Sequence, residues 1–181
     1  MPKSENLLQG IALERGNIYL DDRGYFYEKY NKKFLSKYKI SFVQENISKS
    51  AKGTIRGLHW QSQPKAQDKL VTCITGKIFD VAVDLRRESD TFGFYCSRTL
   101  ECDKNDSLWI PHGFAHGFQA LTEDCVISYS VTSEYSKNES QTINPYCPTI
   151  GISWPIEPSK MSTNDSASKF LNDQINENFF F

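Results

Sequence analysis

Residues 54–61 of this 181-residue chain read Thr-Ile-Arg-Gly-Leu-His-Trp-Gln, a stretch whose β-branched and aromatic residues favour a β-strand. Arg56 precedes His59 by three residues, and Gly57 lies between them. An arginine guanidinium can bind a phosphate through two parallel hydrogen bonds. A histidine imidazole can accept and release a proton near neutral pH. The stretch therefore predicts one strand that carries both an anion ligand and a candidate base.

Successive side chains of a strand point to opposite faces, which separates the two reactive residues. Strict alternation places Gly57 and His59 on one face and Arg56 on the other. A β-bulge at Gly57 would bring Arg56 and His59 to the same face, because glycine tolerates the backbone conformation that a bulge needs. Taken alone, His59 can be read either as a general base or as a buried imidazole that is satisfied by hydrogen bonds.

Alternating patterns further along the chain predict more strands. One pattern places Phe79, Val81, Val83 and Leu85 on one face and Ile78, Asp80, Ala82 and Asp84 on the other. Another runs through residues 125–135 and puts Tyr129 and Tyr135 on one face, ~20 Å apart at ~3.3 Å per residue. Turn residues recur between these patterns, which indicates an all-β sandwich or barrel. Short helices are predicted over Lys32–Tyr38 and Ser166–Gln174.

The bulk composition limits the classes of function. A length of 181 residues predicts one domain over 1–181, with a C-terminal tail from about residue 167. The formal net charge of −1 gives no case for binding nucleic acid or an anionic membrane. No apolar run is long enough to span a bilayer, and the N-terminus lacks the pattern of a signal peptide. Five cysteines without a Cys-x-x-Cys pair favour reduced thiols and a cytoplasmic location.

The three histidines do not form a metal-binding pattern. His112 and His116 are four residues apart, a spacing that suits a metal on a helix, but Pro111 and Gly113 argue against a helix there. A metal site usually needs three or more protein ligands. The His-x-His pair with a nearby glutamate that marks a metal-binding β-barrel is absent, since His59 is followed by Trp60 and Gln61. The sequence therefore predicts no metal site.

Taken together, the motifs of this chain resemble those of the dTDP-4-dehydrorhamnose 3,5-epimerases and their relatives, which act on nucleotide-linked 4-keto-6-deoxy sugars. The matching runs occur in the family's order and are residues 22–26, 42–48, 56–61, 69–71, 76–86, 91–93, 110–118, 129 with 135, 152–155 and 162–165. The resemblance implies a cupin jelly roll, also called a double-stranded β-helix, with a few short peripheral helices. It also implies a homodimer that exchanges N-terminal strands, a nucleotide-diphosphate sugar as substrate, and no cofactor or metal.

The resemblance also implies a role for individual residues. His59 corresponds to the family's base, Asp165 to the carboxylate that supports it, Tyr129 to the acid, and Lys69 to the cation beside the keto oxygen. Expected substrate-binding residues are His116 near that oxygen, Arg56 at the diphosphate, Gln44 and Asn46 around the nucleotide sugar, Tyr135 near the base, and Arg23, Phe26 and Glu28 on an arm that reaches the neighbouring subunit. Without the resemblance, a strand tyrosine is ordinarily core and Lys69 an exposed lysine.

The implied reaction is inversion of C3 and C5 of dTDP-4-dehydro-6-deoxy-D-glucose through an enolate, which gives dTDP-4-dehydro-L-rhamnose. Alternatives are a single-site epimerase or a ketoisomerase on a related dTDP-, CDP- or GDP-linked sugar, a metal-dependent cupin oxygenase, and a sugar-binding module without catalysis. The family usually has tyrosine where this chain has Trp60. Because Trp60 and His59 face opposite sides of the strand, we expect this change to affect packing more than chemistry.

Overall fold

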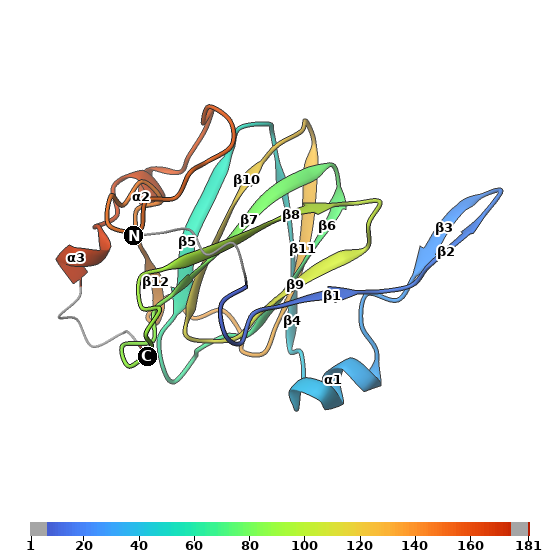
Figure 1. Cartoon of the computed structure of the whole chain (residues 1–181), viewed down its shortest axis with the longest axis horizontal. Helices are drawn as coiled ribbons and strands as arrows, with labels where there is room; N and C mark the ends of the chain where they lie inside the picture. Colours follow the sequence, from blue (N-terminus) through green and yellow to red (C-terminus); the bar gives the residue numbers. More distant parts are fainter. Residues whose placement is uncertain (1–6, 175–180) are drawn as a thin grey trace.

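Two five-stranded antiparallel sheets face each other and confirm the predicted jelly roll (Figure 1). The computed structural model describes residues 7–174 and residue 181. One sheet has the strand order β1-β9-β6-β11-β4, and the other has the order β12-β5-β10-β7-β8. The strands of the first sheet are β1 Ala12–Arg15, β4 Gln44–Ser50, β6 Lys69–Thr75, β9 Asp106–Ile110 and β11 Cys125–Val131. Those of the second are β5 Ile55–Gln61, β7 Lys77–Asp84, β8 Tyr95–Glu101, β10 Phe114–Ala120 and β12 Ser140–Thr142.

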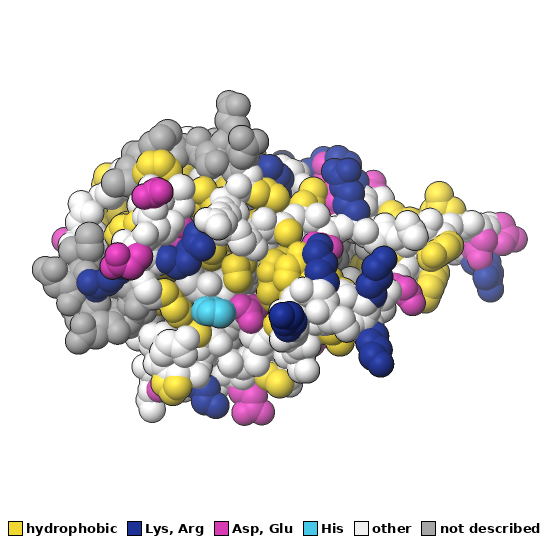
Figure 2. Space-filling view, turned by 60° about the horizontal axis from the view of Figure 1, so that its bottom comes forward, with side chains coloured by type: hydrophobic (Ala, Val, Ile, Leu, Met, Phe, Trp, Pro, Cys, Tyr) yellow, Lys and Arg dark blue, Asp and Glu magenta, His cyan; other side chains and the backbone are white. Residues whose placement is uncertain are grey.

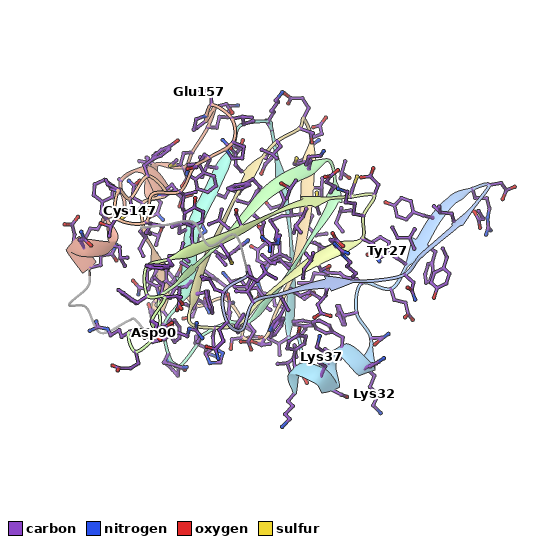
Figure 3. All side chains as sticks on the ribbon, viewed as in Figure 1. Tyr27, Lys32, Lys37, Asp90, Cys147 and Glu157 are labelled. Atoms are coloured by element: carbon purple, nitrogen blue, oxygen red, sulfur yellow. The ribbon has the colours of Figure 1, made fainter. Side chains whose placement is uncertain are left out.

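Apolar side chains pack on both faces of the second sheet, and side chains fill the space between the two sheets (Figure 3). The predicted alternation in β7 is confirmed. Ile78 and Ala82 join the cluster between the sheets, whereas Val81 and Val83 join a second cluster with residues of the C-terminal segment. The second cluster also takes up the Trp60 side chain, which is buried there as its position in the strand predicts. The strand β5 therefore has an apolar layer behind it and the barrel interior in front.

The strand β11 is shorter than predicted, which changes the position of Tyr135. It ends at Val131, and at the next position the Asp68 N–H donates to the Thr132 hydroxyl at 2.9 Å. Thr132 donates its N–H to the Asp68 carbonyl at 3.2 Å and its hydroxyl to the Asp68 carboxylate at 3.1 Å. Beyond this point the Tyr135 N–H donates to the Gln44 side chain at 3.0 Å. The prediction of one strand through residue 135 was wrong, because the side chains of Thr132 and Gln44 accept backbone N–H groups where the sequence pattern continues.

One of the two helix predictions is confirmed. Helix α1, Lys32–Tyr38, begins after Asn31, whose side chain accepts the N–H groups of Lys33 and Phe34. The predicted helix Ser166–Gln174 is instead two short helices, α2 Thr163–Ser166 and α3 Leu171–Gln174. Hydrogen bonds from Asn144 to the end of α2 and to the segment after it separate the two helices.

The side chain of Asn144 donates to the Ser166 carbonyl at 2.8 Å, and its N–H donates to the Lys169 carbonyl at 3.1 Å. A continuous helix would need the Ser166 carbonyl for its own hydrogen bonds. Of the predicted tail, residues 175–180 lie outside the described residues. Phe181 donates its N–H to the Leu85 carbonyl and accepts the Arg87 N–H at 2.7 Å, so its backbone binds the body of the same chain. No helix in the described ranges is long and apolar enough to cross a membrane.

A hairpin of strands β2 Ile18–Asp21 and β3 Gly24–Tyr27 projects away from the two sheets (Figure 1). Its large apolar side chains are exposed, with Leu20 at 79% and Phe26 at 64%. They are visible as yellow patches on the projecting end of the molecule (Figure 2). An exposed apolar hairpin of this kind is typical of a surface that another protein covers.

Candidate active site

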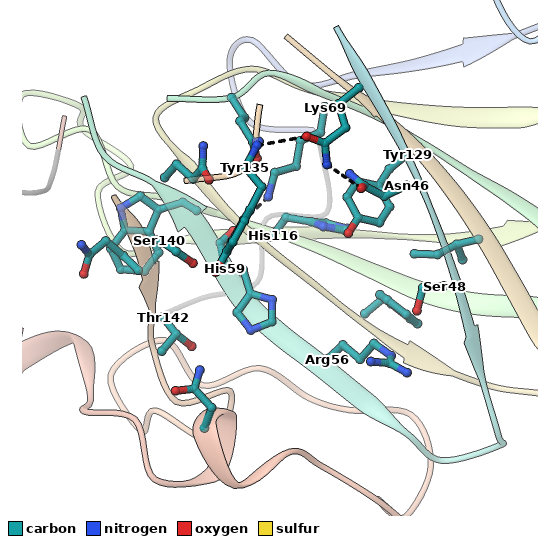
Figure 4. A pocket seen from close by; sticks show the side chains of 18 of the residues that line it. Asn46, Ser48, Arg56, His59, Lys69, His116, Tyr129, Tyr135, Ser140 and Thr142 are labelled. Carbon is teal, nitrogen blue, oxygen red and sulfur yellow. Dashed lines mark hydrogen bonds between the residues drawn. The ribbon is translucent and has the colours of Figure 1, made fainter. Parts of the chain in front are cut away.

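A cavity of about 790 Å³ opens between the two sheets and brings together most of the predicted site residues (Figure 4). It is lined by eight of them: Gln44, Asn46, Arg56, His59, Lys69, His116, Tyr129 and Tyr135. Asp165 lies beside this cavity, where it contacts His59. The structure does not bring Arg23, Phe26 or Glu28 to the cavity of their own chain. Their side chains belong to the projecting hairpin and the segment after it, where Arg23 pairs with Asp21 and Glu28 accepts a hydrogen bond from Asn31.

The predicted bulge in β5 is present. His59 lies opposite His116 of β10, but Arg56 lies opposite Phe118, so two residues of β5 face one of β10. Gly57 makes this possible with a φ of +122°, in the region that favours glycine. A Cβ at Gly57 would lie 2.6 Å from the Cα of Gly117. The bulge turns both Arg56 and His59 toward the cavity.

His59 and Asp165 form a hydrogen-bonded pair. Asp165 lies in α2 and is buried, and one of its carboxylate oxygens contacts His59 Nε2 at 2.6 Å while the other accepts the Gly57 N–H at 3.4 Å. Burial alone would raise the pKa of Asp165. The hydrogen bond and the charge of His59 lower it by more than burial raises it, so the pKa of Asp165 is below its ordinary value. The imidazole itself is 44% exposed. A carboxylate therefore fixes one ring nitrogen and leaves the ring open to the cavity.

Lys69 reaches the same place from the opposite sheet. Its side chain is buried, and its Nζ donates to the His59 carbonyl at 3.2 Å. Burial lowers the pKa of Lys69 to about 8, and the negative charge of Asp80 opposes that shift. A buried ammonium whose pKa lies near neutral pH can stabilise negative charge that develops beside it.

A second histidine–carboxylate pair lies on the floor of the cavity. His116 Nε2 contacts a carboxylate oxygen of Asp80 at 2.8 Å, and Asp80 is fully buried. The other carboxylate oxygen of Asp80 has no hydrogen-bond partner among the described residues. The sequence interpretation did not select Asp80. Its signal was an aspartate between Ile78 and Ala82, two buried apolar residues on the same face of β7.

Two tyrosines line the cavity together. Tyr129 lies in β11 between Asn46 of β4 and Val71 of β6. Burial raises its pKa, and the nearby Arg56 charge lowers it less, so the phenol keeps its proton at neutral pH and can donate it. Tyr135 also lines the cavity, although it lies beyond the end of β11.

Polar and cationic groups complete the lining. Arg56 donates from Nε to Ser50 at 3.0 Å and from Nη2 to the Lys49 carbonyl at 3.1 Å, so two neutral acceptors orient its guanidinium. The Gln44 amide donates to the Asn46 side chain at 2.7 Å. Further lining residues, which sequence reasoning did not select, are Gln61, Gln67, Lys137, Ser140, Gln141, Thr142 and Asn164. Several of them come after residue 135, where the predicted strand ends, and the sequence pattern gave no sign that this part of the chain reaches the cavity.

The arrangement is suited to proton transfer at carbon. The imidazole of His59, a group that can take up a proton, and the phenol of Tyr129, a group that can donate one, lie on facing sheets, and the ammonium of Lys69 lies in the same cavity (Figure 4). Negative charge that forms next to the buried Lys69 would be stabilised by its ammonium group. Within residues 7–174 and 181, no group of three or more histidine, cysteine, aspartate or glutamate side chains is placed to hold a metal ion.

Comparison with known proteins identifies the relatives of this chain. The family model described as dTDP-4-dehydrorhamnose 3,5-epimerase matches residues 5–173. The chain is 42% identical over 165 residues to the dTDP-4-dehydrorhamnose 3,5-epimerase of Shigella flexneri, with 89% of this chain and 91% of the relative covered. It is 46% identical over 165 residues to that of Sinorhizobium fredii, with 89% and 85% covered.

Solved structures agree with this result. A dTDP-6-deoxy-D-glucose-3,5-epimerase from Legionella pneumophila in complex with dTDP-4-keto-L-rhamnose superimposes with a TM-score of 0.88 at 38% identity, covering 94% of this chain and 91% of that one. A 3'-monoepimerase from Streptomyces bikiniensis in complex with dTDP-quinovose superimposes with a TM-score of 0.90 at 28% identity, covering 99% and 92%.

We predict that Lys69 titrates near pH 8 in the folded protein, well below the ordinary value of 10.5. The unfolded chain binds more protons than the folded chain between these two values, so this group makes stability rise with pH across that window. Asp80→Asn should lower the pKa of Lys69 further, because the charge of Asp80 raises it. NMR titration of lysine Cε in the parent and the variant measures both. A Lys69 midpoint near 10.5 in the folded parent would contradict the description of the site.

Proposed function

Because this chain belongs to the dTDP-4-dehydrorhamnose 3,5-epimerase family, we propose that it inverts C3 and C5 of dTDP-4-dehydro-6-deoxy-D-glucose to give dTDP-4-dehydro-L-rhamnose. It is an isomerase of nucleotide-linked sugars. The observation that carries the proposal is the pairing of His59 with Asp165 in one cavity with the buried ammonium of Lys69. This set of groups matches what the removal of a proton beside a ketone requires.

The first step is proton removal by His59. The C4 ketone acidifies the hydrogens on C3 and C5, and the imidazole takes one of them. The electron pair of the broken C–H bond forms a double bond between that carbon and C4 of the sugar. The product is an enolate, whose negative charge lies largely on the C4 oxygen. Lys69 and His116 stabilise that oxygen, while Asp165 stabilises the imidazolium that has formed. General acid–base catalysis of this kind typically contributes ~10²–10⁴ in rate.

The second step returns a proton from the opposite face. Tyr129 donates its phenolic proton to the carbon, which inverts the centre and restores the ketone. Solvent then reprotonates the phenolate, and the His59 imidazolium releases its proton to solvent. Burial supports this role because it keeps the phenol protonated until the enolate forms. Repetition at the other neighbour of C4 gives the doubly inverted sugar.

The remaining lining residues hold the substrate. Arg56 binds the diphosphate with guanidinium N–H groups that its two protein contacts leave unused. Gln44 and Asn46 contact the nucleotide sugar, and Tyr135 closes the cavity beside the base. Binding energy from the diphosphate, which does not react, orients the sugar ring over His59.

Epimerisation at C3 alone is the second candidate, because the structure superimposes closely on that of a solved 3'-monoepimerase. Both reactions use the same base, cation and acid. They differ in whether C5 also exchanges its hydrogen with the enzyme, so one experiment separates them.

Turnover in D₂O tests the reaction. We expect deuterium at both C3 and C5 of dTDP-4-dehydro-6-deoxy-D-glucose, read by NMR of the sugar ring, because each returned proton comes from a group in exchange with solvent. Deuterium at C3 alone would assign the single-site reaction. An active preparation that incorporates none would rule out the enolate route.

Tyr129→Phe refines this test. The variant should still exchange hydrogen, because His59 can remove and return a proton on one face, but it should lose at least ~10²-fold in inversion. Inversion of both centres by Tyr129→Phe at the parent rate would remove Tyr129 as the acid. Tyr135→Phe is the comparison variant, because it makes the same change in the same cavity, and a larger loss of inversion there than in Tyr129→Phe would make Tyr135 the acid instead.

We also propose a homodimer in which each subunit lends its hairpin to the site of the other. The exposed apolar side chains of the hairpin support this, as does the position of Arg23, Phe26 and Glu28 away from the cavity of their own chain. In such a dimer a cation and an aromatic ring would reach the nucleotide of the neighbouring subunit. A cytoplasmic location fits the five free thiols, four of them buried.

Mixing two inactive variants tests the exchange. His59→Ala lacks the base but has an intact hairpin, and the double variant Arg23→Ala/Phe26→Ala has the base but a defective hairpin. If the hairpin acts on its neighbour, each mixed dimer has one complete site, and random mixing restores roughly a quarter of the parental activity. Different affinity tags on the two variants verify that mixed dimers have formed. Verified mixed dimers without activity would show that the hairpin does not act in this way.

A further inference from the structure

A second cavity, of about 390 Å³, adjoins the main one and shares Arg56 and His59 with it. It lies on the side of the His59–Asp165 pair where the chain leaves β4 and enters β5. Its walls are Lys49, Ser50, Ala51, Thr54, Ile55, Arg56, His59, Lys160, Met161, Ser162 and Asp165. Two segments far apart in the sequence therefore enclose a space next to the base.

The backbone fixes Lys160 in this wall. The Ser159 N–H donates to the Gly53 carbonyl at 3.0 Å, and the Ile55 N–H donates to the Lys160 carbonyl at 3.0 Å. Thr54 and Lys160 form a parallel bridge. The same segment continues into α2, which places Asp165 against His59. The position of Lys160 is thus tied to the position of the base.

The charges around this cavity are unbalanced. Lys49 is already paired with Asp124 at 2.8 Å, and Asp165 is already paired with His59. Arg56 has only neutral acceptors, Ser50 and a backbone carbonyl. Lys160 forms no ion pair with any residue in the described part of the chain. Two cations without a protein anion therefore flank a space beside the catalytic histidine.

We propose that Lys160 is a second ligand of the substrate's diphosphate and binds it from the side opposite to Arg56. This proposal rests on the proposed function. A diphosphate carries two negative charges, and two cations on different segments can bind both phosphates at once. Because Lys160 and Asp165 belong to one segment, the diphosphate is then held at a fixed place relative to the base, which orients the sugar carbon toward His59.

Calorimetry with dTDP and with thymidine tests this assignment. Lys160→Gln should weaken dTDP roughly tenfold, the usual loss for one charge-assisted hydrogen bond, and leave thymidine unchanged. Lys160→Arg should retain most of the dTDP affinity, because it keeps the charge. Lys52→Gln is the matched control. This variant also removes one lysine charge, and Lys52 lies close to Lys160 because the Ser159 hydroxyl donates to the Lys52 carbonyl. Lys52 lines neither cavity.

Lys137→Gln tests the rival position. Lys137 lines the main cavity near Tyr135, and a larger loss of dTDP affinity there than in Lys160→Gln would place the diphosphate at that end and overturn the proposal. Parental dTDP affinity in Lys160→Gln would also overturn it, as would an equal loss in Lys52→Gln. These outcomes concern binding alone. Failure of the proposed function would appear instead as absence of epimerisation by the parent protein.

Discussion

The bulge at Gly57 is the constraint on which the rest of the site depends. Without a Cβ, Gly57 approaches the backbone of Gly117 and adopts a φ of +122°. The strand gains one residue at this point, so Arg56 and His59 face the same cavity although the regular alternation of a strand would separate them. The Gly57 N–H also donates to Asp165, which links the bulge to the carboxylate that contacts His59. One residue without a side chain thus sets the geometry of three that have charge or proton-transfer chemistry.

The interior of the barrel keeps charges that an ordinary core would exclude. Burying an ammonium or a carboxylate is costly unless a partner compensates it. Here Asp165 is compensated by His59, but one oxygen of Asp80 has no partner in the described ranges, and Lys69 has a pKa of about 8. Departures of this kind are typical of functional sites, where stability is given up for reactivity. Lys69 and Asp80 lie where the proposed mechanism needs a cation that stabilises negative charge on the substrate.

Local patterns predicted much of this structure, and long-range contacts account for what they missed. The alternation in β7, the helix Lys32–Tyr38 and the bulge at Gly57 depend on neighbouring residues and were predicted correctly. The end of β11 and the break between α2 and α3 depend on Asp68 and Asn144, which are distant in sequence from the segments they interrupt. The resemblance to a known family supplied the selection of site residues. Composition and spacing alone would have left Lys69 and Tyr129 as ordinary strand residues, and Asp80 was not selected at all.

The most direct test of this account measures two properties of Gly57→Ala together: the affinity for dTDP and the rate of hydrogen exchange in D₂O. The account predicts that both fall at least ~10-fold, because an added Cβ must displace the strand segment that holds Arg56 and His59. Gly76→Ala is the control, since Gly76 also has a positive φ of 79° and a Cβ there would collide with Thr122, away from the cavity. That variant should lose stability but keep both properties. A folded Gly57→Ala protein with parental affinity and exchange would contradict the claim that the bulge builds the site.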